Sequence, residues 1–238
     1  MPLADDQARQ IRFNRAGDFH GSSGPKGTDS DEVRARILEV AEEYFRRIGY
    51  GKTSVADIAS ELGMSRANVY RFFPSRNAIK ESICRRVLNG IAEVAFTIAS
   101  SNAPPLEKLE KLLTAIHRHC KMTLLKEKRL HDLLVAAMQE NWPVINSHIE
   151  QLVTIFEAII REGIGMGACK IEDPAEAARA VNTAFIPFLH PILIEHCVQR
   201  GEDTEAALRE QIRFIQKALG QSDYARRPAG CGPGRLTI

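Results

Sequence analysis

The chain has few of the features that mark secreted, membrane-spanning or disulfide-stabilised proteins. Its 238 residues contain only five cysteines, and no two of them form a C-x-x-C pair. An odd number of scattered cysteines argues for free thiols rather than for a disulfide framework. No run of about 18 apolar residues is present, so no transmembrane helix is expected. The first residues are polar and charged where a secretory signal would be apolar, which favours a cytoplasmic protein.

Aromatic residues are also scarce, at 6% of the chain, and no segment alternates apolar and polar residues for long enough to predict a strand. The expected fold class is therefore all-α. The sequence also lacks a Gly-rich phosphate loop, a nucleophile paired with a base, and metal ligands at suitable spacing. We therefore expect neither an enzyme nor a bound cofactor or metal, and a helical enzyme stays only as a remote alternative.

The chain has no strong excess of one charge, since its net charge is +2, but the charges are unevenly distributed. Residues 31–90 hold 11 Lys and Arg against 8 Asp and Glu, whereas residues 91–220 hold 14 against 17. A basic N-terminal segment followed by an acidic body is typical of a protein that brings a small head to DNA.

Apolar residues recur at helical spacing from about Ser30 almost to the C-terminus. Asp29 and Glu32 form a candidate capping box for the first helix, and Gly49 provides a left-handed stop. Similar start and stop signals predict about nine helices, over residues 30–48, 54–62, 65–73, 75–99, 105–125, 128–140, 143–166, 174–199 and 203–219.

The most informative stretch is Thr53–Ile79, where two short helices meet at Gly63-Met64-Ser65. A tight turn between near-perpendicular helices needs a left-handed residue, which glycine supplies. Apolar residues hold the second helix against the first: Ile58, Leu62, Met64, Val69 and Phe73. The remaining residues of the second helix face outwards: Ser65, Arg66, Ala67, Asn68, Tyr70, Arg71 and Phe72.

This outward face suits the major groove of DNA. Arginine can bridge the two acceptors of guanine and asparagine can pair with adenine, while a small residue such as Ala67 allows close approach. Thr53 and Ser54 stand at a helix N-terminus, where hydroxyls and free N–H groups can bind a phosphate. Arg76 lies in the first turn of the fourth helix, where a cation opposes the helix dipole unless an anion binds it. A glycine-turned helix pair also occurs in proteins that bind no DNA, so the motif alone leaves that reading open.

The order of these motifs resembles the TetR family of bacterial transcriptional regulators. The resemblance is carried by TSVADIA from Thr53, LGMS from Leu62 and VYRFFPSR from Val69, and it covers about residues 32–90. It implies that the helix after Gly63 enters the major groove and that the residues at positions 70 and 76 contact phosphates. Two residues depart from the family pattern, since Arg76 stands for the usual lysine and Ala67 for a frequent glycine.

The resemblance also implies a homodimer that reads a palindromic operator, and a repressor that a small-molecule inducer releases from it. In this family the segments at about 174–199 and 203–219 form the dimer interface. The expected organisation is a flexible leader (1–29), an N-terminal three-helix helix-turn-helix DNA-binding domain (30–90), a C-terminal helical-bundle domain for ligand binding and dimerisation (91–220), and a disordered tail (221–238). The last helix of the DNA-binding domain bridges to the body.

The body is apolar enough to enclose a ligand or simply a core. Core residues are expected at Leu112, Leu113, Ile116, Leu124, Leu133, Leu134, Met138, Ile149, Leu152, Val153, Phe156, Ile160, Val181, Phe185 and Phe188. Candidate ligand-binding residues are His117, Cys120, Met138, Trp142, Phe156, Phe185 and His190, and core packing is the alternative for each.

Two further features of the body leave alternatives open. His117 and Cys120 share a helix face, but His119 points elsewhere, so no metal site is expected. Pro187 and Pro191 should bend or break their helix, either as a kink that fits a dimer partner or to free carbonyls that line a cavity. A regulator of the same fold that answers to a protein partner, or to no ligand, would have its bundle filled by side chains; a cavity of a few hundred cubic ångströms would argue against it.

Overall fold

The computed structural model describes residues 26–220, and every regular element in that range is a helix. The ten helices are α2 (Lys26–Ile48), α3 (Val55–Glu61), α4 (Arg66–Phe72), α5 (Arg76–Ala99), α6 (Pro105–Lys126), α7 (Lys128–Gln139), α8 (Pro143–Gly165), α9 (Pro174–Leu189), α10 (Pro191–Gln199) and α11 (Thr204–Gly220). The all-α prediction is confirmed. The expected leader and tail lie outside the described residues, except for residues 26–29, which begin α2.

The chain divides into two compact units, Met1–Ile37 and Leu38–Ile238. The division falls within α2, so the described part of the first unit is the N-terminal half of that helix. The second unit contains the rest of α2 and all the helices that follow.

Two helix boundaries differ from the sequence-based expectation. The first helix begins at Lys26, so Asp29 and Glu32 lie inside α2 and do not cap it. The segment expected as one helix over 174–199 is two helices, α9 and α10, which meet at His190 with a bend of 43°, so the bend or break predicted from Pro187 and Pro191 is confirmed. Pro191 opens α10 because it has no N–H to continue α9, whereas Pro187 is accommodated inside α9.

Local capping residues set the starts of the short helices. Ser54, Ser65 and Ser75 are the N-caps of α3, α4 and α5, and each side chain accepts a hydrogen bond from a backbone N–H one turn later. Gly63 has φ +63°, the left-handed conformation that the α3–α4 turn requires. The helix starts therefore follow from residues adjacent in sequence.

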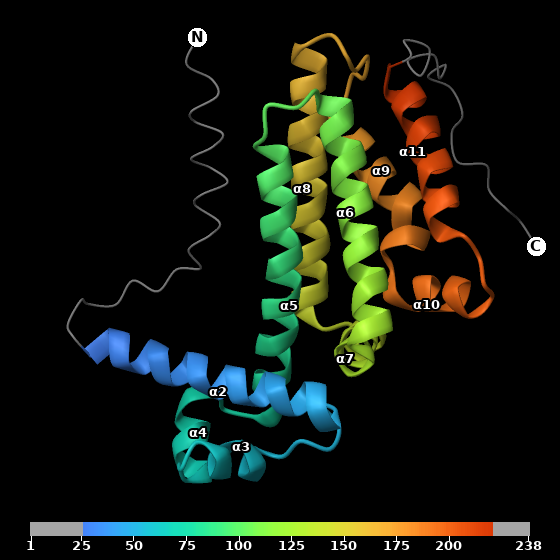
Figure 1. Cartoon of the computed structure of the whole chain (residues 1–238). Coiled ribbons are helices and arrows are strands. Elements are labelled where there is room, and N and C mark those ends of the chain that lie inside the picture. The colour runs from blue at the N-terminus through green and yellow to red at the C-terminus, as the bar shows by residue number, and fades with distance from the viewer. Residues whose placement is uncertain (1–25, 221–238) are drawn as a thin grey trace, which may run out of the picture. The chain divides into compact units, whose positions relative to one another are not determined.

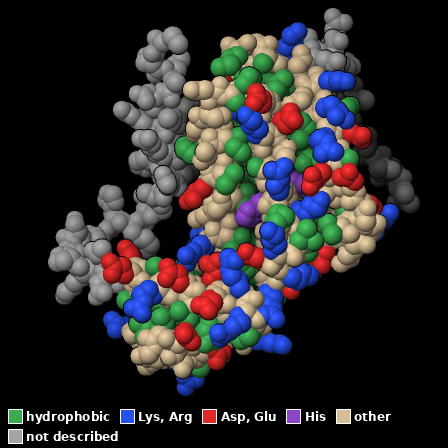
Figure 2. All heavy atoms as spheres, in the orientation of Figure 1, with side chains coloured by type: hydrophobic (Ala, Val, Ile, Leu, Met, Phe, Trp, Pro, Cys, Tyr) green, Lys and Arg blue, Asp and Glu red, His purple; other side chains and the backbone are tan. Residues whose placement is uncertain are grey.

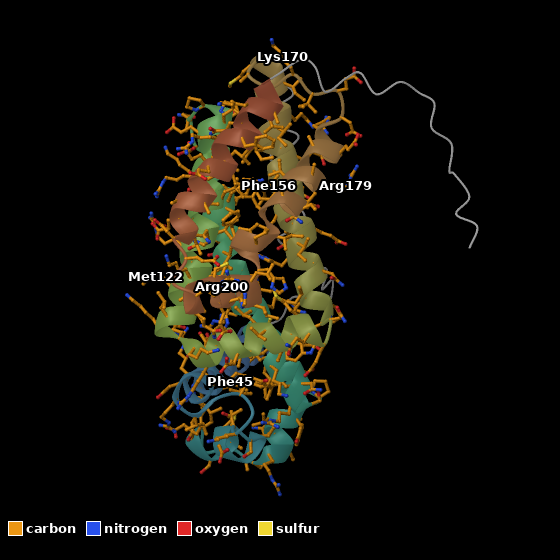
Figure 3. The ribbon with its side chains drawn as sticks, turned by 90° about the vertical axis from the view of Figure 1, so that its right-hand side faces the viewer. Phe45, Met122, Phe156, Lys170, Arg179 and Arg200 are labelled. Carbon is orange, nitrogen blue, oxygen red and sulfur yellow. The ribbon has the colours of Figure 1, made fainter. Side chains whose placement is uncertain are left out.

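In the second unit, α5, α6 and α8 lie side by side, α9 packs against α8, and α10 and α11 pack against α6 and α9 (Figure 1). The interior is filled by fully buried apolar side chains, and Figure 3 shows Phe156 among these helices, whereas Met122 and Lys170 lie at the margin. Ile149 is the one expected core residue that the structure exposes, at 40%. It projects from the solvent side of α8, so that prediction was wrong.

The surface of this unit mixes basic, acidic and apolar side chains (Figure 2). Among the described residues, no single helix is long and apolar enough to cross a membrane. The bent pair α9 and α10 passes the same test of length and composition, as core helices of soluble proteins also do.

The C-terminal end of α8 packs closely against the chain that follows it. A Cβ atom added at Gly163 would lie 2.5 Å from the Sγ of Cys169, and the Gly163 carbonyl accepts hydrogen bonds from the N–H groups of Ala168 and Cys169. Beside it, the buried Lys108 ammonium lies 2.7 Å from the Glu162 carboxylate. Glycine is needed here because of close approach rather than because of backbone conformation.

We expect Gly163→Ala to lower the free energy of unfolding by about 1–3 kcal/mol, because the Cys169 side chain has to move within a packed site. Thermal and urea unfolding would measure the change, and adding Cys169→Ala should recover part of it. Gly90→Ala is the matched control, since nothing lies within 4 Å of its added Cβ in the middle of α5. This control should stabilise by about 0.5–1 kcal/mol; equal effects at both glycines would contradict the packing argument.

Candidate functional site

The α3–α4 pair forms a helix-turn-helix. The turn is closed by a 2.8 Å hydrogen bond from the Met64 N–H to the Ala59 carbonyl, next to the left-handed Gly63. Val69 and Phe73 are fully buried and hold α4 against its neighbours. The seven-residue α4 thus depends on packing for its stability, because a helix this short is not stable alone.

The opposite face of α4 is open to solvent, as predicted. The Tyr70 side chain is 47% exposed, and Asn68 is half-buried. Phe72 is also half-buried rather than fully turned outwards. The other residues predicted to face DNA are exposed: Ser65, Arg66, Ala67 and Arg71.

At the N-terminus of α3, the polar groups expected to bind phosphate already have hydrogen-bond partners in the protein. The hydroxyl and N–H of Ser54 both donate to the Asp57 carboxylate, at 2.7 and 2.8 Å, and these bonds lower the pKa of Asp57. The Thr53 hydroxyl is buried and donates to the Gly49 carbonyl at 3.0 Å. A direct phosphate contact from Thr53 therefore requires the turn to open, and it stays a prediction.

Arg76 also has protein partners. Its Nη2 donates to the carbonyls of Tyr50 and Gly51, both at 2.7 Å, and its Nε is buried without a hydrogen-bond partner. One turn along α5, the Lys80 ammonium lies 5.4 Å from the centre of the Tyr50 ring. Burial and the charge of Arg76 lower the pKa of Lys80. Sequence reasoning identified Arg76 but not these partners, which lie some 25 residues away.

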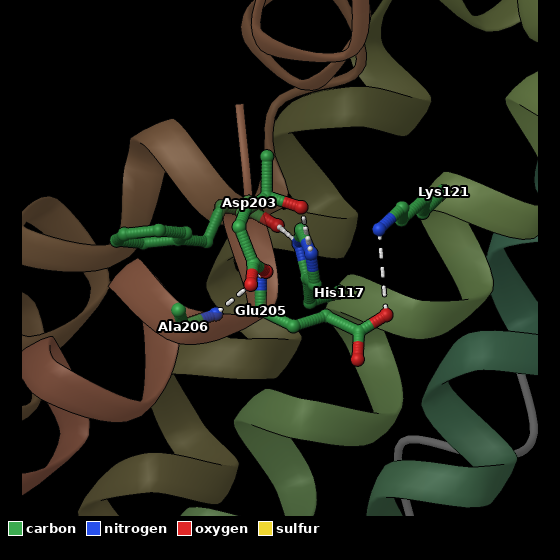
Figure 4. A network of polar contacts seen from close by, with 7 residues as sticks. His117, Lys121, Asp203, Glu205 and Ala206 are labelled. Carbon is green, nitrogen blue, oxygen red and sulfur yellow. Dashed lines mark hydrogen bonds and ion pairs between the residues drawn. The ribbon is translucent and has the colours of Figure 1, made fainter. Parts of the chain in front are cut away.

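In the body, two of the predicted ligand-binding residues hold the break between α9 and α10. His117, only 1% exposed, has Nδ1 2.8 Å from the Phe188 carbonyl and Nε2 3.0 Å from the Thr204 hydroxyl (Figure 4). Because a carbonyl only accepts, Nδ1 donates, and in the neutral ring Nε2 accepts from Thr204. Burial lowers the pKa of His117, which favours this neutral form. The Cys120 thiol donates to the Leu189 carbonyl at 3.7 Å, and burial raises its pKa to about 12.

The other predicted ligand-binding residues do not gather at one opening. Phe156 and Phe185 are fully buried in the core, and Met138 is half-buried. The Trp142 indole, at the connection between α7 and α8, donates to the Glu140 carboxylate at 2.9 Å. His190 is half-buried at the α9–α10 break, and its Nδ1 has no hydrogen-bond partner.

A half-open groove of about 330 Å³ lies between α5 and α6. Sequence reasoning missed it, because its residues follow the helical period and look like packing positions. Two large apolar residues that line the groove, Val94 and Met122, are 48% and 37% exposed, so the fold leaves this apolar face uncovered. None of the predicted ligand-binding residues lines this groove, which is formed by Ile91, Val94, Ala115, Ile116, Arg118, His119 and Met122. Within residues 26–220, no three His, Cys, Asp or Glu side chains are arranged to hold a metal ion.

Comparison with known proteins decides the family. The model of "Bacterial regulatory proteins, tetR family" matches residues 37–83, and that of "Tetracyclin repressor-like, C-terminal domain" matches residues 105–208, together more than half of the chain. The chain belongs to the TetR family. It is a DNA-binding transcriptional regulator.

Individual relatives of this regulator agree with that assignment. The chain is 26% identical over 142 residues to the transcriptional repressor KstR2 of Mycolicibacterium smegmatis, a match that spans 57% of this chain and 66% of the repressor. Its fold resembles SmeT, the repressor of a Stenotrophomonas maltophilia efflux pump, with a TM-score of 0.59, 20% identity, and coverage of 88% of this chain and 100% of SmeT. SmeT has also been solved with triclosan. RolR in complex with resorcinol gives a TM-score of 0.55 at 15% identity, covering 84% of this chain and 93% of RolR.

The α9–α11 region of the regulator exposes apolar side chains. Ile186, Leu193 and Phe214 are 41%, 38% and 66% exposed. Exposed apolar side chains mark an interface where they form one continuous patch, whereas single ones are common on any protein surface. These three residues fall within the two segments from which the sequence predicted dimerisation.

We expect His117→Leu to lower the regulator's free energy of unfolding by about 1–3 kcal/mol, because the Phe188 carbonyl and the Thr204 hydroxyl lose their buried partner. Urea unfolding at neutral pH would measure the loss. His119→Leu, an exposed position on the same helix, is the control and should change stability little. A His117→Leu protein as stable as the parent would show that the α9–α10 break does not depend on this hydrogen bond.

Proposed function

We propose that this regulator is a homodimeric repressor that reads a palindromic operator with α4 and is released from it by a small molecule. The observation that carries the proposal is the two-sided character of α4. Val69 is fully buried on one side, and polar side chains that can read bases or bind phosphates stand exposed on the other. In this proposal residues 30–90 form the head that binds DNA and residues 91–220 the body that binds ligand and partner, and the protein acts on the DNA of the bacterial cytoplasm.

The proposed division of labour follows the chemistry of each side chain. Arg66 and Asn68, near the N-terminus of α4, read base edges, and Ala67 allows the helix to come close. Tyr70, Arg71 and Ser65 contact the backbone. The exposed N-terminus of α3 at Ser54 offers a further, weaker place for a phosphate, since its hydroxyl is shared with Asp57.

A dimer is proposed because one seven-residue helix reads too few bases for specific recognition, and two-fold pairing doubles the contact. The exposed apolar residues Ile186, Leu193 and Phe214 supply a surface for it on α9–α11. Two identical heads related by a two-fold axis read inverted half-sites, which is why a palindrome is expected.

The small-molecule effector is proposed because the similar proteins RolR and SmeT have been solved with resorcinol and triclosan. Its proposed contacts are the predicted residues His117, Cys120, Met138, Trp142, Phe156, Phe185 and His190. A second candidate, regulation by a protein partner or without a ligand, is favoured by the burial of Phe156 and Phe185 in a filled interior. The two candidates differ in whether a small molecule changes the affinity of the protein for DNA.

Selection of bound DNA from a random pool should yield a palindromic sequence, and binding to the winning duplex tests the roles of α4. Asn68→Ala and Arg66→Ala should change which bases are preferred, because they remove base contacts worth about 1–3 kcal/mol each. Tyr70→Phe should weaken binding to selected and scrambled duplexes alike, because it removes a backbone contact only. Unchanged base preferences in both Asn68→Ala and Arg66→Ala would contradict the reading role of α4.

Thermal unfolding with resorcinol and triclosan tests the effector proposal. A compound that binds the folded protein raises its Tm, and an inducer also weakens binding of the selected duplex. His190→Ala should reduce the rise in Tm if the compound binds inside the body. Met122→Ala should reduce the rise in Tm if the compound binds the α5–α6 groove. A compound that raises Tm without weakening DNA binding would favour the second candidate.

A further inference from the structure

The side chain of Arg76 connects the two ends of the helix-turn-helix. The segment from Gly51 to Ser75 contains the whole of α3 and α4, and Arg76 follows it directly in the chain. The Arg76 guanidinium reaches back to the other end of this segment, where Nη2 donates to the carbonyls of Tyr50 and Gly51 at 2.7 Å each. A 25-residue loop that carries the DNA-reading helix is thereby closed by two charge-assisted hydrogen bonds.

The rest of the Arg76 environment supports this bridging role. Nη2 carries two hydrogens, and both are used by the two carbonyls. The Nε–H is buried away from solvent, so it is not presented to DNA, and the Nη1 amino group is the part of the guanidinium that is left for a phosphate. Arg76 binds the backbone carbonyl of Tyr50, and the side chain of the same residue is also in contact with its surroundings. The Tyr50 ring packs against the Phe45 ring, with ring centres 6.5 Å apart, and lies near the Lys80 ammonium.

The turn that Arg76 holds sets the start of α3. Its backbone is folded by hydrogen bonds from the N–H groups of Lys52 and Thr53 to the Gly49 carbonyl, both 3.2 Å. The next residue, Ser54, is the N-cap of α3. A shift of this turn therefore moves α3, and with it the α4 helix that packs on α3.

We propose that Arg76 is a positioning residue for DNA recognition, which joins the two ends of the helix-turn-helix and holds α4 at the angle that the major groove requires, rather than a phosphate ligand. It acts through the Tyr50–Gly51 backbone. Lysine, the usual residue at this position in the family, does not make the same bridge here, because its ammonium ends about one bond short of Nη2.

The charge-conserving variant Arg76→Lys separates positioning from phosphate binding. We expect Arg76→Lys to weaken binding to the selected duplex by about tenfold or more at every salt concentration, as the loss of two hydrogen bonds to a charged group predicts. The slope of log affinity against log salt concentration should not change, because the charge is kept. In the DNA-free protein, amide exchange at Lys52 and Thr53 should become faster while helix content by circular dichroism stays the same.

Two comparisons complete the experiment. Arg85→Ala removes the same charge from an exposed position on the same helix, and it should leave amide exchange in the 49–53 turn unchanged. Arg76→Ala should match Arg76→Lys in the faster exchange. The proposal is overturned if Arg76→Lys binds like the parent while Arg76→Ala lowers the salt slope by about 0.9, the value for one lost phosphate contact. It is also overturned if both variants bind the duplex like the parent, since Arg76 would then serve stability alone.

Discussion

Every helix end leaves backbone groups that need hydrogen-bond partners, and this requirement organises the whole molecule. Ser54 and Ser65 supply these partners for the two helices of the helix-turn-helix, and Ser75 does so for α5. In the body, Asp173 and Asp203 accept from the first N–H groups of α9 and α11. Each of these caps is adjacent in sequence to the helix that it serves. The position of a Ser or Asp in the sequence therefore sets where each of these helices begins.

The break between α9 and α10 meets the same requirement in another way. Its freed carbonyls, at Phe188 and Leu189, are bound by His117 and Cys120 of α6, about 70 residues away in the sequence. Thr204, the first residue of α11, completes the network at His117. Three helices, α6, α9 and α11, therefore meet at one buried imidazole, in the part of the body where an effector and a second subunit are proposed to act. The break is thus hydrogen-bonded to α6, which packs on α5, the helix that leads to the head.

The head combines a fixed inner side with an open outer side. Val69 and Phe73 anchor α4, so Arg66 and Asn68 are presented at its N-terminal end without needing the helix to be stable by itself. The polar groups behind this surface, on Thr53 and Arg76, are turned inwards to backbone carbonyls. Charged and hydroxyl side chains of this region thus fall into two groups, those exposed on α4 and those that bond to backbone carbonyls behind it.

The sequence by itself determined the all-α class, the helix-turn-helix, the left-handed turn at Gly63 and the exposure of Tyr70 against the burial of Phe73. These depend on residue periodicity and on caps within one turn, which are local in the chain. Only the tertiary structure decided the partners of Arg76 and His117, the groove between α5 and α6, and which of the two prolines separates α9 from α10. The physical reason is that a long or buried polar side chain bonds to whichever carbonyl the fold brings within reach, and that carbonyl lies tens of residues away with no trace in the local pattern.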